Sequence, residues 1–314
     1  MIREPLPADL AGQFSVAAAL ERGISADRLR TLPAPFRGIR TLEPVGDSVL
    51  DAAKAFSPRL RPSQFFSHRT AALLWRIPLP GFDVMPLHVT TAAPGRPPSG
   101  KGIVGHCMVV ESRDLVRIAG LPVTSAPRTW ALLTDELAIH DLVAAAEYLV
   151  TGVSLSRIYP LTTLDELRRI TARLASSRGH RNRIAALEAV RPGPLSRPES
   201  LVRLVLVRSG IPEPEINVPC LDEHGGLVAV PDLRWPRYKV ALEYEGDHHR
   251  DVAQFRRDIQ RIERLVDAGW IVVKVSADDL FARPGDLVRR VARRLTARGW
   301  HGVADLRFSG HFER

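Results

Sequence analysis

The chain has 314 residues, 45% of them apolar, which is enough to bury at least one hydrophobic core and predicts a globular protein of two or three domains. Lys and Arg total 44 against 35 acids, and this net charge of +9 suits a polyanion such as DNA or RNA, although an Arg-rich composition also follows from a GC-rich genome. No stretch approaches a membrane-spanning run of apolar residues and the N-terminus has no basic-then-apolar leader, so we expect a cytoplasmic protein without a membrane partner.

Cysteines and histidines give no sequence sign of a disulfide framework, a structural metal or a small-molecule cofactor. The two isolated cysteines, Cys107 and Cys220, are expected to be buried thiols in a reducing cytoplasm. Four histidines, His68, His88, His106 and His140, are scattered without the spacing of metal ligands. We therefore expect these histidines to be structural or solvated.

Residues 1–60 predict a small winged-helix-like domain. An apolar stretch ends at Gly23, Ser25 can cap a second helix, and residues 36–40 are expected to form a wing. This order resembles the N-terminal domain of AbiEi-type antitoxins, which implies DNA binding. The candidate phosphate contacts are Arg28, Arg30, Arg37 and Arg40. Eight basic residues face seven acids across this segment, so a degenerate winged helix that only mediates contacts stays open.

Residues 61–158 predict a mixed α/β segment. Residues 67–75 are expected to begin a helix, 87–90 and 102–106 to form strands, and 124–129 to lead into a helix that runs through Leu149. The stretches Ser67-His68-Arg69-Thr70-Ala71 and Thr124-Ser125-Ala126-Pro127-Arg128-Thr129 resemble the segment that follows the winged helix in the same antitoxins. Those stretches indicate a fold and no chemistry.

Residues 159–195 predict a basic helical connector. Thr163 and Glu166 fit a capping box, and eight arginines between Tyr159 and Pro198 face three acids. The surplus favours either an arm that contacts phosphates or a solvated helix face. Residues 191–194, with two prolines and a glycine, are the expected linker to the last domain.

Residues 196–314 predict an α/β (α+β) domain with a mixed central sheet. Ser196 can cap a helix, strands are expected near 215–219, 228–235 and 239–245, and a helix passes through residues 255–266. A fourth strand at 270–275 and an arginine-rich helix at about 285–298 complete the domain.

Three acids stand among apolar residues on the second and third of these strands. If the hairpin pairs in register, Asp232 lies beside Glu243, and side chains alternate so that Glu243 and Glu245 share a face. Carboxylates that converge repel one another unless a divalent cation such as Mg²⁺ or Mn²⁺ compensates. The alternative is an edge hairpin whose acids face water and pair with Arg234, Arg237 or Lys239.

The same stretch resembles the DUF559 and very-short-patch-repair-like branch of the PD-(D/E)XK nucleases, which have the restriction-endonuclease-like fold. The resemblance rests on Pro231-Asp232, Glu243-Tyr244-Glu245-Gly246, His248-His249, Arg257-Asp258 and Gly269-Trp270 leading to Asp278-Asp279-Leu280. It implies Asp232 and Glu243 as metal ligands together with the backbone carbonyl of Tyr244. Glu245 stands where the family name has lysine, and Lys274 on the fourth strand is a candidate for the missing positive charge.

Further candidates surround these acids. His248 and His249 can act as a general base or donate to a phosphate oxygen, or can pack and cap the next helix. Glu199 either reaches the metal through water or serves the helix N-terminus alone. Four arginines on the predicted helix form a candidate phosphate-binding stripe: Arg256, Arg257, Arg261 and Arg264.

The leading function is a metal-dependent DNA endonuclease that hydrolyses phosphodiester bonds. In this reading the N-terminal half positions the protein, and the catalytic candidates are Asp232, Glu243, Glu245, His248, His249, Glu199 and Lys274. The alternative is a non-catalytic DNA-binding regulator similar to an AbiEi antitoxin, in which arginines would neutralise the acids. A protein-interaction scaffold is a third possibility.

Overall fold

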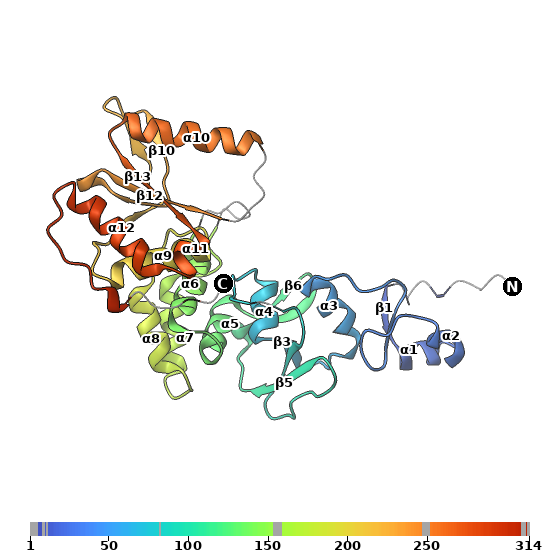
Figure 1. The fold of residues 1–314 in the computed structure, drawn as a ribbon. Coiled ribbons are helices and arrows are strands. Elements are labelled where there is room, and N and C mark those ends of the chain that lie inside the picture. Colours follow the sequence, from blue (N-terminus) through green and yellow to red (C-terminus); the bar gives the residue numbers. More distant parts are fainter. Residues whose placement is uncertain are drawn as a thin grey trace. The chain divides into compact units, whose positions relative to one another are not determined.

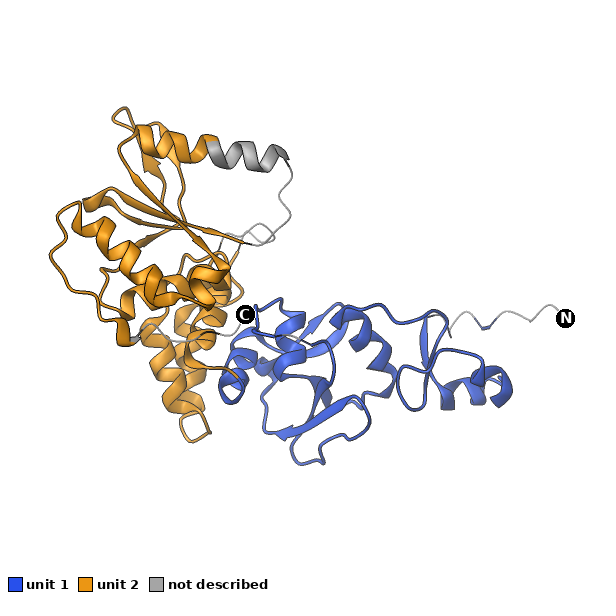
Figure 2. Cartoon of the chain, in the orientation of Figure 1, with its two compact units in different colours: residues 1–136 blue, residues 137–314 orange. Residues whose placement is uncertain are grey.

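The computed structural model describes residues 6, 7, 10, 12–81, 83–152, 159–246, 252–308 and 312, and side chains within 252–259 are left aside. The fold is mixed α/β and forms two compact units, residues 1–136 and 137–314 (Figure 2). These are called the N-terminal unit and the C-terminal unit below. The sequence predicted boundaries after residues 60, 158 and 195, none of which coincides with this division.

The N-terminal unit begins with the predicted helix, turn and helix (Figure 1). Its elements are β1 (Gln13–Ser15), α1 (Val16–Glu21), α2 (Ala26–Arg30) and β2 (Ile39–Thr41). The predicted cap at Ser25 is confirmed, because its side chain accepts a hydrogen bond from the Arg28 backbone N–H. The expected wing is a single strand, β2. It pairs antiparallel with β1, which precedes the two helices in the chain.

A five-stranded mixed sheet forms the rest of this unit, in the order β5-β4-β3-β7-β6. The elements are α3 (Val49–Phe56), β3 (Gln64–Phe66), α4 (His68–Leu74), β4 (Leu87–Ala92), β5 (Ile103–Met108), β6 (Leu115–Ile118), β7 (Leu121–Thr124) and α5 (Ala126–Leu132). Phe36, Phe56 and Phe66 lie in one apolar core, with ring centroids 5.1 Å apart for the first pair and 6.4 Å for the second. The segments before and after residue 60 therefore share a core.

Two expectations about this part of the chain are wrong. Cys107 is exposed because it lies on β5, the edge strand of the sheet, while Cys220 is buried as expected. The helix expected to run through Leu149 is two helices, α5 and α6 (Ile139–Val150), separated by a short 3₁₀ turn at Leu133–Asp135. The Thr134 hydroxyl donates to the Ala131 carbonyl in this turn, which helps to end α5.

The C-terminal unit contains α6, α7 (Leu164–Arg173), α8 (His180–Ala189) and α9 (Arg197–Arg208), and α6 packs against α8 and α9. The predicted capping box of α7 is confirmed by reciprocal hydrogen bonds between Thr163 and Glu166. No helix among the described residues is both long and apolar enough to cross a membrane.

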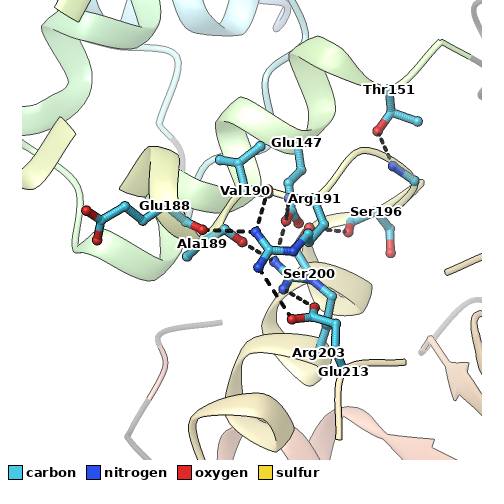
Figure 3. A network of polar contacts seen from close by, with 11 residues as sticks. Glu147, Thr151, Glu188, Ala189, Val190, Arg191, Ser196, Ser200, Arg203 and Glu213 are labelled. Carbon is cyan, nitrogen blue, oxygen red and sulfur yellow. Dashed lines mark hydrogen bonds and ion pairs between the residues drawn. The ribbon is translucent and has the colours of Figure 1, made fainter. Parts of the chain in front are cut away.

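A buried polar network ties α6 to the start of the last domain (Figure 3). Glu147 on α6 and Arg203 on α9 are almost fully buried and form an ion pair. Arg203 also donates to the Ala189 carbonyl at 2.8 Å and to Glu213 at 3.1 Å. The Arg191 backbone N–H donates to Glu147 at 2.8 Å, so the expected linker at 191–194 is fixed to α6.

Arginines of the predicted connector and of the start of α9 serve the fold. Arg183 is 1% exposed and donates to the Leu174 carbonyl and the Ser177 hydroxyl. Arg197 is buried against Asp141 at 2.7 Å. Because these guanidinium groups are occupied inside the protein, the surplus of arginines in the sequence overstates the charge that a phosphate could contact.

The last domain has a four-stranded sheet in the order β13-β12-β11-β8. Its elements are β8 (Glu215–Ile216), β9 (Cys220–Leu221), β10 (Leu227–Ala229), β11 (Leu233–Trp235), β12 (Val240–Glu245), α10 (Val252–Asp267), β13 (Ile271–Ser276), α11 (Ala277–Phe281) and α12 (Pro284–Thr296). Strands β8, β11 and β12 are antiparallel, and β13 pairs parallel to β12 after the crossover through α10. The predicted strand at 228–235 is two strands, since β10 pairs with β9 in a separate small sheet.

Alternating side chains of this sheet enter two different cores. Leu242 and Val273 pack with residues of α9 and α12, whereas Ala241 packs with Leu265 of α10 and with the β9–β10 pair. Side chains alternate along a strand, so Glu243 points to the opposite face from Leu242. This is the face on which Ala241 packs against α10. The candidate acids are therefore at the carboxyl end of β12, on the face that α10 covers.

Candidate acidic site

The hairpin register brings Asp232 and Glu243 to neighbouring positions. Leu233 is opposite Leu242 in the β11–β12 ladder, so the next pair outward is Asp232 with Glu243. Asp232 Oδ2 accepts a hydrogen bond from the Tyr244 backbone N–H at 2.6 Å. This bond fixes the Asp232 carboxyl at the end of β12, as the register argument predicted.

Burial of the carboxyl, followed by the nearby Glu199 carboxylate, raises the pKa of Asp232 to about 7. The Tyr244 N–H and the Arg261 guanidinium act in the opposite direction. A carboxyl with this pKa is only partly ionised near neutrality. Any cation that binds here would relieve the repulsion between Asp232 and Glu199.

Glu243 is 4% exposed and pairs with a cation from the covering helix. Arg261 on α10 places Nη2 2.8 Å from Glu243 Oε2. Arg261 was expected in a phosphate-binding stripe, whereas its side chain lies in the acidic site. The helical spacing correctly predicted an amphipathic helix but did not show that one of its polar residues turns toward the sheet.

Glu245 lies in a different ion pair. Lys274 is opposite Glu243 in the parallel β12–β13 ladder, and its Nζ lies 2.7 Å from Glu245 Oε1. Lys274 therefore shares the face of both glutamates, with its ammonium group at Glu245. In the described part of the chain, the acids Asp232, Glu243 and Glu245 do not form a group whose carboxylate oxygens all lie within 4.8 Å of one another.

The bonds of Glu199 serve the start of α9. Its carboxylate accepts from the Ser196 hydroxyl and the Leu195 N–H, each at 2.8 Å, and from Asn217 Nδ2 at 3.0 Å. The capping role that the sequence predicted for Ser196 and Glu199 is thus present. The same carboxylate is close enough to Asp232 to raise its pKa, so Glu199 adds negative charge to the site.

The basic residues named in the alternative reading of the hairpin bind elsewhere. Arg234 pairs with Glu215 at 2.6 Å, and Lys239 donates to the Ala268 carbonyl at 3.2 Å. His248 and His249 lie outside the described residues, as do the side chains of Arg256 and Arg257. Arg264 is exposed on α10.

The four arginines predicted to contact DNA in the N-terminal unit differ in their surroundings. Arg40 is partly buried and donates to the carbonyls of Leu29 and Ile39, so its guanidinium joins β2 to α2. Arg30 is exposed and pairs with Asp27. Arg37 is exposed and Arg28 is partly buried. The prediction for Arg40 as a phosphate contact is disfavoured, because Nε and Nη1 of its guanidinium already donate inside the fold.

A second cluster was missed by the sequence analysis. His68, His88 and His106, expected to be separate, meet on the five-stranded sheet of the N-terminal unit. They come from the start of α4, from β4 and from β5, and the loops between these elements hide the proximity in the sequence. The signal that could have revealed them is the position of His88 and His106 in two neighbouring strands.

Comparisons with known proteins give few relatives. The chain is 36% identical over 154 residues to two uncharacterized proteins of Mycobacterium tuberculosis, from strains CDC 1551 / Oshkosh and ATCC 25618 / H37Rv. The match covers 45% of this chain and 56% of each relative, so the chain spans about half the length of the curated relatives it matches. No family model and no solved structure matches.

Proposed function

We propose that the C-terminal unit is a metal-dependent DNA endonuclease of the DUF559 and very-short-patch-repair-like type, with a restriction-endonuclease-like core. The element order supports this proposal: α9 precedes the three antiparallel strands β8, β11 and β12, and α10 leads into the parallel strand β13. The acids stand at the carboxyl end of the central strand, where a ligand of such a sheet would bind.

One observation carries the proposal: the half-buried Asp232 is next in register to the buried Glu243 and close to Glu199. The Glu199 carboxylate disfavours the ionisation of the partly buried Asp232. A structural role alone would not require this arrangement, since apolar residues could fill the same strand positions at lower cost.

The donor set fits Mg²⁺ or Mn²⁺, because Asp232, Glu243 and the Tyr244 carbonyl all offer oxygen. When bound, the ion supplies charge neutralisation for the scissile phosphate and lowers the pKa of a coordinated water. The Tyr244 N–H orients the Asp232 carboxyl for this role. Arg261 and Lys274 add positive charge on the same face of the sheet, and Lys274 stands in for the lysine that Glu245 replaces.

Plasmid cleavage tests the proposal. Purified protein is incubated with supercoiled plasmid and Mg²⁺ or Mn²⁺, beside Asp232→Asn, Glu243→Gln and the control Glu223→Gln, which changes an exposed acid of the same unit. We expect nicking or linearisation by the wild type and the control, and none by the other two variants. Gel retardation with Ca²⁺ in place of Mg²⁺ checks that the inactive variants still bind DNA.

A non-catalytic DNA-binding regulator is the second candidate, and the ion pairs favour it. Glu243 is paired with Arg261 and Glu245 with Lys274, which is the neutralised arrangement expected of a nuclease fold kept for binding. Retardation of plasmid by all four proteins without cleavage by any of them would support this candidate. Failure of the wild type both to bind and to cleave DNA would exclude both.

A further inference from the structure

Three histidine rings are in mutual contact in the N-terminal unit. The ring centroids of His68 and His106 lie 3.7 Å apart, and those of His88 and His106 lie 5.2 Å apart. One ligand nitrogen from each ring lies within 4.8 Å of the other two. His88 Nδ1 and His106 Nε2 are 3.1 Å apart. Two nitrogens on a tetrahedral Zn²⁺, with bonds of about 2.0–2.1 Å, would be separated by roughly 3.3 Å.

The backbone holds two of these rings on neighbouring strands. His106 is opposite Thr90 in the parallel β4–β5 ladder, so it is the diagonal neighbour of His88 on the same face. The His88 backbone N–H donates to the Thr70 hydroxyl at 2.7 Å, which joins β4 to α4. The sheet register therefore brings the nitrogens of His88 and His106 together, and the stacked rings of His68 and His106 would have to turn for their in-plane lone pairs to meet at one ion.

His68 is held in a constrained conformation beside them. Its φ is 48°, in the left-handed region that residues other than glycine and asparagine rarely adopt. Ser67 Oγ lies 2.8 Å from His68 Nδ1 and 2.6 Å from the Thr90 hydroxyl. With Nδ1–H donating to Ser67 Oγ, Nε2 has the free lone pair of a ligand atom, and hydrogen bonds of this kind commonly orient metal-binding histidines.

Charge and solvent access also suit a cation. Glu136 Oε1 lies 3.9 Å from His88 Nδ1 and provides a carboxylate at the cluster. His68 and His106 keep partial exposure, which gives an ion a route of entry.

We propose that His68, His88 and His106 bind one divalent transition-metal ion of the Zn²⁺ class, beside the Glu136 carboxylate. Three imidazoles select Zn²⁺ or Co²⁺ over Mg²⁺, which prefers oxygen ligands. The ion would join α4 to β4 and β5 and so stabilise the N-terminal unit, separately from the chemistry proposed for the acidic site. This inference is independent of the proposed nuclease activity.

The test measures metal content and metal-dependent stability of the whole chain. Apo-protein prepared with a chelator is titrated with Zn²⁺ in a calorimeter, and Co²⁺ is added to record its visible absorption. We expect one equivalent of Zn²⁺, a tetrahedral Co²⁺ spectrum, a rise in Tm on adding Zn²⁺ and no competition from Mg²⁺. Absence of Zn²⁺ binding by the wild type would overturn the proposal.

Variants assign the site. His106→Gln and His68→Asn are expected to lose the equivalent of Zn²⁺ and the rise in Tm. His68→Asn also keeps the metal-free fold, because asparagine tolerates a left-handed φ. Ser67→Ala, which removes the partner of His68 Nδ1 and of the Thr90 hydroxyl, is expected to weaken Zn²⁺ binding about 10- to 100-fold.

Two controls separate this cluster from the other histidines. His301→Gln changes an exposed histidine of the C-terminal unit, and the double variant His248→Gln/His249→Gln removes the pair near the acids in sequence. Both are expected to keep full Zn²⁺ binding. If His106→Gln still bound one equivalent of Zn²⁺, or if either control lost it, the ion would be bound elsewhere and the assignment would be refuted.

Discussion

Arg261 Nη2 lies 2.8 Å from Glu243 Oε2, so the buried carboxylate at the end of β12 already has a positive partner on α10. This contact bears on both candidate functions. In a nuclease the guanidinium competes with a divalent cation for Glu243, or moves to a phosphate when that cation binds. In a regulator it replaces the cation permanently.

Replacement of Arg261 is predicted to improve divalent cation binding. Arg261→Gln removes a positive charge next to the proposed ligand, and like charges at this distance disfavour a second cation. We expect Mn²⁺ affinity to rise severalfold, measured from the loss of the free Mn²⁺ signal in electron paramagnetic resonance. Arg264→Gln, an exposed arginine of the same helix, is expected to leave Mn²⁺ affinity unchanged. Unchanged or weaker binding by Arg261→Gln would argue against Glu243 as a ligand.

The buried pair of Glu147 and Arg203 is predicted to be sensitive to the loss of one partner. Arg203→Met leaves a carboxylate in a site that is 0% exposed, which costs about 3–5 kcal/mol of the free energy of unfolding. The double variant Glu147→Leu/Arg203→Met is expected to be more stable than the single variant, because neither charge remains. Urea unfolding followed by circular dichroism measures both.

Arg208→Met supplies the control for that comparison, since Arg208 is exposed on the same helix. Its free energy of unfolding is expected to change by less than about 0.5 kcal/mol. If Arg203→Met were as stable as Arg208→Met, the network in Figure 3 would contribute little to the fold.

Gly105 is predicted to resist any side chain. A Cβ at this position would lie 1.8 Å from the Pro98 carbonyl oxygen, so the loop before β5 would have to move. We expect Gly105→Ala to lower the free energy of unfolding by about 1–3 kcal/mol, as overpacking does. The measurement is the Tm of the metal-free protein, recorded with a chelator present. Gly23→Ala has open space around the new Cβ but a φ of 80°, and is expected to cost about 1 kcal/mol through backbone strain alone. Equal costs for the two variants would contradict the steric account of Gly105.

The capping box of α7 predicts a pH-dependent contribution to stability. Hydrogen bonds from the Thr162 hydroxyl and then from the Thr163 N–H hold the pKa of Glu166 below its ordinary value. Because the folded-state pKa is depressed, the stabilisation is present above about pH 4.5 and is lost as the pH falls through the folded pKa. The Tm difference between wild type and Glu166→Gln is expected to shrink between pH 5 and pH 3. A constant difference would show that the Glu166 charge contributes nothing.

The sequence predicted those features that depend on local periodicity. Alternation along the hairpin placed Asp232 beside Glu243, and residue preferences identified the caps at Ser25, Ser196 and Thr163. These predictions needed only neighbours within a few residues or one tight turn. The metal and the chemistry assigned to the acids stay predictions.

Features that depend on distant partners were missed. Glu147 meets Arg203 across 56 positions of sequence, and no local pattern marks α6 as part of the C-terminal unit. His88 and His106 meet because β4 and β5 are parallel, a pairing that requires a connection whose path the sequence does not reveal. Arg261 was expected in a phosphate-binding stripe, because a helical pattern alone cannot tell which polar residue turns toward the sheet.

The ion pair between α6 and α9 also limits which segments of the gene can recombine into other genes and still encode a folded domain. A gene segment that begins at codon 137 encodes Glu147 together with Arg203 and Glu213, and so carries a complete set of buried partners. A segment that begins at codon 196 encodes Arg203 without Glu147, leaving a buried guanidinium short of its carboxylate. We therefore expect recombination to transfer the last domain to other proteins only together with the three helices that precede it.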